Sequence, residues 1–111
     1  MSLNFSHIQG DTFEAVNFEV IKNGDALDLT DAVIRMQLKK ECNGIPILSF
    51  TSVANAGLTI INAALGLFKI NRQIINIPEF NYSYDIEITF ADQTVKTWVS
   101  GSFLVQCDIT R

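Results

Sequence analysis

The alternation of apolar and polar side chains between residues 82 and 103 constrains the fold of this chain more than any other feature. In the stretch YSYDIEITF, residues 82–90, every second side chain is large and apolar. A second alternating stretch spans residues 95–103, and Asp92 and Gln93 between the two are typical of a turn. The period of two predicts a β-hairpin with one buried and one solvated face.

A two-residue turn fixes how the strands of this hairpin pair. It places Tyr84 opposite Gly101, where an aromatic ring can cover the backbone that a glycine leaves bare. The same register puts Trp98 on the outer face, across from Glu87. The predicted inner pairs are Phe90 with Val95, Ile88 with Thr97, Ile86 with Val99, Tyr84 with Gly101 and Tyr82 with Phe103, and Thr89 faces Lys96 outside.

A second hairpin is predicted near the N-terminus. A run rich in β-forming residues spans positions 12–21 and leads to Asn23-Gly24, a pair that readily adopts the two positive φ angles of a type I′ turn. The predicted pairs are Lys22 with Asp25, Val20 with Leu27 and Phe18 with Leu29.

Short β-forming runs between turn residues predict four more strands, at residues 33–39, 45–50, 58–61 and 67–70. Pro46 argues for an edge position of its strand, because proline has no N–H to donate to a neighbour. A helix over residues 58–77 is the alternative, since apolar residues recur there at helical spacing. Gly57, Gly66 and the β-branched content disfavour that helix.

About seven strands in 111 residues predict an all-β protein, an immunoglobulin-like antiparallel β-sandwich forming a single domain over residues 1–111. The buried Cys–Trp–Cys pattern of antibody domains is missing, so this expectation rests on strand number and spacing. The only two cysteines, Cys42 and Cys107, are expected to be free thiols.

The net charge of −4 disfavours nucleic acid and anionic membranes as partners. The one basic segment, with Arg35, Lys39 and Lys40, fits the solvated face of a strand. No window is long and apolar enough for a membrane span, and no signal peptide precedes the first strand, so a soluble product is expected.

The residues give little sign of catalytic or metal chemistry. His7 is the only histidine, and we expect it to be an exposed or strand-edge imidazole. Asp25, Asp28 and Asp31 recur every three residues and invite a calcium hypothesis, but aspartates also stabilise turns without an ion. Asp85 shares the outer strand face with Glu87, as in an ordinary solvated sheet. We therefore predict no catalytic residue, no cofactor and no metal ligand.

Trp98 is the most informative residue of the predicted outer face. A large aromatic side chain among polar neighbours often marks a contact surface. It can also simply lie along the side chains of Glu87 and Lys96, or under a loop. The candidate interface residues are Trp98, Lys96, Glu87 and Pro46.

Four segments in a fixed order carry a family resemblance. They are GDTF, NGDALDLTDAVIRMQL, YSYDIEITFADQTVKTWVSGSFLV and DITR. Together they resemble small immunoglobulin-like domains of tailed-phage and prophage tail and baseplate proteins, including the amino-terminal domain of upper baseplate proteins. Asp31 and Gln93 stand where that pattern usually has glycine, which affects the turns more than the fold.

The resemblance implies a non-enzymatic virion structural protein, assembled in the bacterial cytoplasm. It implies other phage structural proteins as partners, contacts through sheet edges and one exposed face, and possible homo-oligomers. The alternative is a carbohydrate-binding or host-recognition β-sandwich module, for which Trp98 is the only good aromatic platform in the sequence.

Overall fold

The computed structural model describes residues 2–41 and 44–109 and is nearly all β, with 57% of residues in strands and 6% in helices. The helical residues form two single 3₁₀ turns, η1 (Val53–Asn55) and η2 (Ala63–Leu65). The strands are β1 (Phe5–Ile8), β2 (Thr12–Phe13), β3 (Val16–Glu19), β4 (Ile21–Lys22), β5 (Asp25–Ala26), β6 (Val33–Lys39), β7 (Leu48–Thr51), β8 (Leu58–Asn62), β9 (Leu67–Ile70), β10 (Gln73–Ile74), β11 (Phe80–Thr89) and β12 (Val95–Gln106). The predicted all-β class is confirmed.

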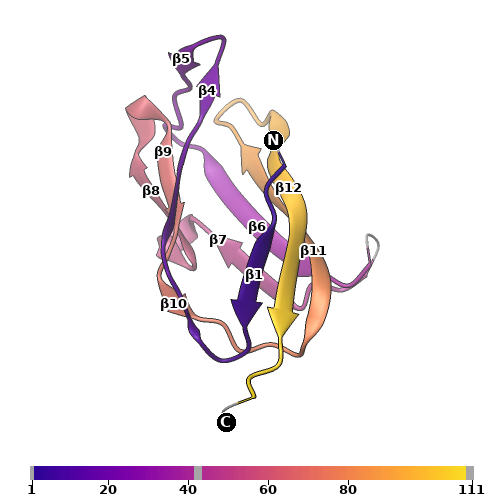
Figure 1. Ribbon diagram of the computed structural model, residues 1–111. Coiled ribbons are helices and arrows are strands. Elements are labelled where there is room, and N and C mark those ends of the chain that lie inside the picture. The colour runs from indigo at the N-terminus through magenta and orange to yellow at the C-terminus, as the bar shows by residue number, and fades with distance from the viewer. Residues whose placement is uncertain (1, 42–43, 110–111) are drawn as a thin grey trace.

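The largest sheet has five strands in the order β1-β12-β11-β6-β7, so β1 and β7 form its two edges (Figure 1). All its strand pairs are antiparallel except β1 with β12, which run parallel. A three-stranded sheet has the order β3-β9-β8, and β2 with β10 and β4 with β5 form two short pairs. Two isolated bridges, Ser2 with Ser100 and Thr51 with Gly57, also occur. The β4–β5 pair projects beyond one end of both larger sheets (Figure 1).

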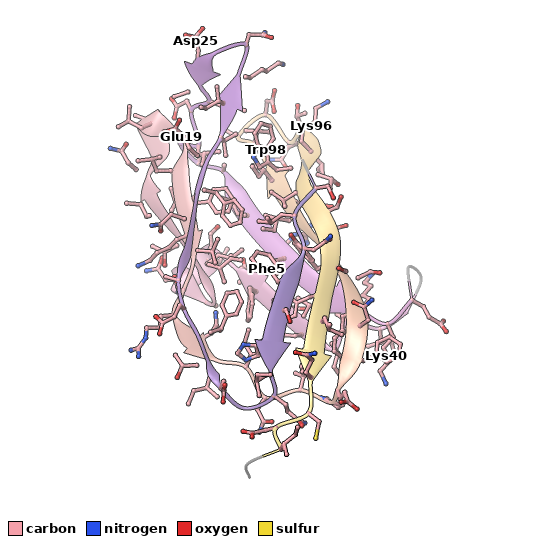
Figure 2. All side chains as sticks on the ribbon, viewed as in Figure 1. Phe5, Glu19, Asp25, Lys40, Lys96 and Trp98 are labelled. Atoms are coloured by element: carbon pink, nitrogen blue, oxygen red, sulfur yellow. The ribbon has the colours of Figure 1, made fainter. Side chains whose placement is uncertain are left out.

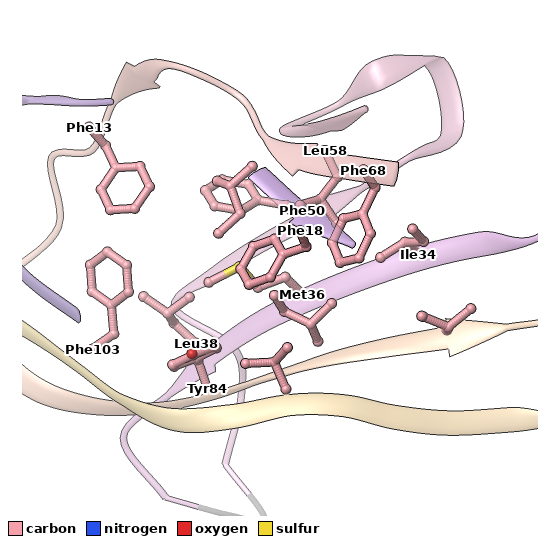
Figure 3. Packing of buried hydrophobic residues seen from close by; sticks show 14 of the residues in the cluster. Phe13, Phe18, Ile34, Met36, Leu38, Phe50, Leu58, Phe68, Tyr84 and Phe103 are labelled. Carbon is pink, nitrogen blue, oxygen red and sulfur yellow. The ribbon is translucent and has the colours of Figure 1, made fainter. Parts of the chain in front are cut away.

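One apolar core lies between these sheets, and Figure 3 shows side chains from both filling it. The alternating side chains Ile34, Met36 and Leu38 of β6 are fully buried, as predicted for residues 33–39. From the other sheet, Phe18 stacks on Phe68 with ring centroids 5.0 Å apart. The apolar residues that alternate in the sequence of β6 are thus the residues that the structure buries.

The first predicted hairpin is only partly confirmed. Lys22 pairs with Asp25, and both turn residues have positive φ, 56° at Asn23 and 83° at Gly24. The prediction that Phe18 pairs with Leu29 is wrong: residues 12–21 form three short strands, and β3 pairs with β9. The physical reason is the core, because pairing with β9 brings the ring of Phe18 onto that of Phe68.

The C-terminal hairpin follows the predicted register in its inner half and departs from it near the tip. Tyr82 pairs with Phe103, Tyr84 with Gly101 and Ile86 with Val99. A bulge then shifts the register, so the outer pairs are Glu87 with Thr97, Ile88 with Lys96 and Thr89 with Val95. Four predicted pairs are therefore wrong: Phe90 with Val95, Ile88 with Thr97, Glu87 with Trp98 and Thr89 with Lys96.

The loop at the tip explains this shift. The backbone N–H of Phe90 donates to the carbonyl oxygen of Thr94 at 2.8 Å, and Gln93 has a φ of 73°. The register that this loop sets differs by one residue from the register of the inner half of the hairpin. Trp98 is the additional residue that restores the register, as in a β-bulge.

The middle of the chain is strand and turn, so the alternative helix over residues 58–77 is wrong. Only η2 at Ala63–Leu65 is helical there, and it ends at Gly66 with a φ of 68°. The strand predicted at residues 45–50 begins later, at Leu48, so Pro46 lies just before it. Its predicted edge position is confirmed.

Candidate functional site

A groove of about 660 Å³ opens at the end of the molecule that carries the β4–β5 pair. One wall is formed by Lys22, Leu27, Asp28 and Thr30, and the other by the tip of the β11–β12 hairpin. In Figure 2, Trp98 and Lys96 lie at this end, close to the β4–β5 pair. The lining residues are Lys22, Leu27, Asp28, Thr30, Phe90, Ala91, Asp92, Thr94, Lys96, Thr97 and Trp98. We call this the hairpin groove.

Three apolar side chains form the base of the hairpin groove. Leu27, Phe90 and Trp98 are each partly buried and pack against the core, while each also contributes to the groove lining. The sequence predicts that Trp98 points to the outer, polar face, and this is wrong. The bulge changes the alternation at this residue, which is a recognised way in which a sheet re-aims a side chain.

Two carboxylates on the rim are held in place by their own turns. Oδ1 of Asp28 accepts hydrogen bonds from the backbone N–H and the hydroxyl group of Thr30, at 2.9 and 2.6 Å. Oδ1 of Asp92 accepts a 3.0 Å bond from the N–H of Thr94. These bonds lower the pKa of both carboxyl groups, so both are ionised at neutral pH.

Of the four predicted interface residues, the structure brings together two. Trp98 and Lys96 both line the hairpin groove. Glu87 does not line it. Its Oε1 lies 2.7 Å from the guanidinium Nη2 of Arg35 on the neighbouring strand β6. Pro46 is also separate, because it precedes β7 at the far edge of the five-stranded sheet.

His7 meets one of its two predicted descriptions, a strand-edge imidazole, and not the other, an exposed one. It lies on the edge strand β1, but only 7% of it is exposed. Its Nε2 is 3.2 Å from the carbonyl oxygen of Ile75, and its ring contacts those of Phe13 and Phe103. This imidazole is part of the core, because β1 packs its inward face against the residues that follow β9.

The calcium hypothesis gains no support from the part of the chain that the structure describes, where no group of three or more potential metal ligands occurs. Asp28 serves a turn, and Asp31 has a φ of 61°, the backbone angle that a glycine would adopt more readily. Cys107 is a free, exposed thiol, as predicted, whereas Cys42 lies outside the described residues. Within the described ranges, no helix is long and apolar enough to cross a bilayer.

Sequence reasoning misses most of the hairpin groove. Asn23-Gly24 and Asp92-Gln93 are both visible as turns, yet nothing local indicates that the two turns lie at the same end of the molecule. The sequence therefore assigns residues such as Phe90 only to a hairpin.

The tertiary contacts of the hairpin groove thus define its geometry, and comparison with known proteins adds nothing to it. No protein-family model matches this sequence, and no curated protein shows significant similarity to it.

Proposed function

We propose that this protein is a non-enzymatic structural component of a tailed phage or prophage that mediates tail or baseplate assembly through protein–protein contacts. In this proposal the chain is made in the bacterial cytoplasm and becomes part of the virion. Its partners are other phage structural proteins or further copies of itself. The order and spacing of the four sequence segments support the assignment to phage tails.

Two features support an immunoglobulin-like β-sandwich of about seven strands, the fold that this resemblance implies. The five-stranded and three-stranded sheets contribute side chains to one shared core. Tyr82, near the start of β11, donates a 2.6 Å hydrogen bond to the carbonyl oxygen of Pro78. Such a bond from a tyrosine near the start of the penultimate strand is the tyrosine corner of immunoglobulin-like sandwiches.

The observation that carries the proposed function is the edge strand β7. It is the last strand of the five-stranded sheet, and its sequence, LSFT, has no charged side chain. Ile45 and Ile47, in the segment leading to it, are 91% and 39% exposed. Charged side chains are one of the devices by which natural edge strands oppose pairing with another chain, and β7 has none. An uncharged edge beside exposed apolar side chains suits strand pairing with a structural partner.

Mass spectrometry of tail particles purified from an induced lysate of the source strain tests this function. We expect the chain at a fixed ratio to the known tail components. The double substitution Ile45→Lys and Ile47→Lys is expected to lower this ratio, because the charges oppose strand pairing. Ile74→Lys is the matched control, since Ile74 is 70% exposed on the short strand β10 and lies outside the proposed contact.

Absence of the chain from purified particles would contradict the proposed function. Incorporation at the unchanged ratio by the double variant would contradict the role of β7. Loss of incorporation by Ile74→Lys as well would show that surface hydrophobicity in general, rather than β7, drives assembly.

A further inference from the structure

The hairpin groove has the size and shape of a small-molecule site. Its volume of about 660 Å³ lies inside the range of roughly 300–1,000 Å³ that is usual for ligand pockets. Its base is apolar and partly aromatic, with Leu27, Phe90 and Trp98, while its rim is polar. Such a combination, in which polar groups surround an apolar surface, is typical of sites that bind small ligands.

The charges on the rim indicate a ligand without net charge. Two ammonium groups, Lys22 and Lys96, and two carboxylates, Asp28 and Asp92, line the hairpin groove. Their formal charges cancel, so the groove offers no general attraction to an anion such as a nucleotide or to a cation such as a polyamine. The groove therefore has to select its ligand through individual hydrogen bonds.

The hydrogen-bonding groups of the rim are numerous and of both kinds. Ionised Asp28 and Asp92 are acceptors, the lysines are donors, and the hydroxyl group of Thr30, which donates to Asp28, can still accept. The turns hold both carboxylates before any ligand arrives. Preorganised acceptors lose less conformational entropy on binding.

A saccharide matches these features together. One face of a pyranose ring consists of C–H groups that pack on an aromatic side chain, while the ring edge carries hydroxyl groups that both donate and accept. We propose that the hairpin groove binds a neutral saccharide of one or two residues, with an apolar ring face against Trp98 and hydroxyl groups on Asp28 and Asp92. This site goes beyond the assembly function, which uses the edge strand β7 and not the tip of the β11–β12 hairpin.

The chain carries its own reporter for this proposal. Trp98 is the only tryptophan, so the tryptophan fluorescence of the whole protein comes from the hairpin groove. The probes are glucose, galactose, mannose and N-acetylglucosamine with their neutral disaccharides, and glucuronic acid and glucosamine as charged counterparts. We expect a saturable change of emission with at least one neutral saccharide, and weaker binding of its charged counterparts.

Two conservative variants locate the binding. Asp28→Asn and Asp92→Asn keep an Oδ1 atom for the turn but remove the charge, and we expect about tenfold weaker binding for each, as loss of a charge-assisted hydrogen bond implies. Asp85→Asn, on the outer face of β11, is the matched control and should leave the affinity unchanged. Amide NMR spectra should show shifts confined to residues 27–30 and 90–98.

Three results would overturn the saccharide site. They are no saturable response to any neutral saccharide of the panel, tighter binding of glucuronic acid or glucosamine than of the neutral sugar, and unchanged affinity in both Asp28→Asn and Asp92→Asn. None of these results bears on incorporation into tail particles, so the two proposals fail separately.

Discussion

The hydroxyl group of Tyr82 lies 2.6 Å from the carbonyl oxygen of Pro78 and donates a hydrogen bond to it, although the tyrosine residue as a whole is fully buried. This bond ties the start of the long strand β11 to the connection that leads into it. The ring of Tyr82 fills the core, so the residue has a packing role and a hydrogen-bonding role that substitution can separate.

Tyr82→Phe keeps the ring and removes the hydroxyl group. We expect the free energy of unfolding to fall by about 1–2 kcal/mol, because the carbonyl group of Pro78 loses its partner beside the core. Urea unfolding followed by fluorescence measures this change. Ser83→Ala, at the neighbouring exposed position, is the control with no expected effect. Equal stability of Tyr82→Phe and the parent protein would show that the bond contributes nothing.

Tyr84 makes the free energy of unfolding depend on pH in the alkaline range. Burial raises the pKa of Tyr84 from 10.0 to about 12, so the folded protein keeps this proton at pH values where the unfolded chain loses it. The free energy of unfolding should therefore be independent of this group below pH 10 and fall as the pH rises from 10 towards 12. Urea unfolding across this range measures the slope.

Tyr84→Phe is the control for the alkaline effect. The free energy of unfolding of this variant should fall less steeply above pH 10 than that of the parent protein. Burial also raises the pKa of Tyr82, so Tyr82 should account for part of the remaining slope. Identical slopes in the variant and the parent protein would exclude Tyr84 as the source.

Gly101 allows the N-terminal segment to approach β12. A Cβ atom at this position would collide with the carbonyl oxygen of Leu3 and lie 2.8 Å from Oδ1 of Asn4. We expect Gly101→Ala to detach β1 from the sheet, with faster hydrogen exchange at Phe5–Ile8 and a loss of stability of about 1–3 kcal/mol. Exchange measured by NMR or mass spectrometry tests this prediction.

Gly24→Ala separates steric contact from backbone strain. Gly24 has a φ of 83°, but no atom lies within 4 Å of the place that a Cβ would occupy, so alanine there should cost only about 1 kcal/mol and leave β1 attached. If Gly101→Ala left the exchange of β1 unchanged, the close approach of Leu3 would not be what requires glycine.

The aspartates around the first turn should act without calcium. Because Asp28 already serves the turn through Thr30, we expect the thermal midpoint to be the same with EDTA and with added Ca²⁺. Asp28→Asn keeps an acceptor for Thr30 and should change the midpoint less than Asp28→Ala. A rise of the midpoint with Ca²⁺ that Asp28→Asn abolishes would restore the calcium hypothesis.

The strands that bury alternate side chains were predictable from the sequence. The pattern of Ile34, Met36 and Leu38 places three apolar groups on one side of any extended backbone, so the face that enters the core follows from geometry alone. The inner pairs of the last hairpin, such as Tyr84 with Gly101, were predictable for the same reason.

Where a strand had several possible pairing partners, only the tertiary structure decided which of them it pairs with. The backbone of β3 could pair with residues 27–29 or with β9, and it pairs with β9, where Phe18 stacks on Phe68. Trp98 turns towards the core because a bulge restores the register after the loop, and alternation cannot reveal a bulge. The hairpin groove exists because two distant turns meet at one end of the molecule. Side-chain alternation is a property of the local backbone, whereas the choice of strand partner, the bulge and the groove depend on contacts between distant segments.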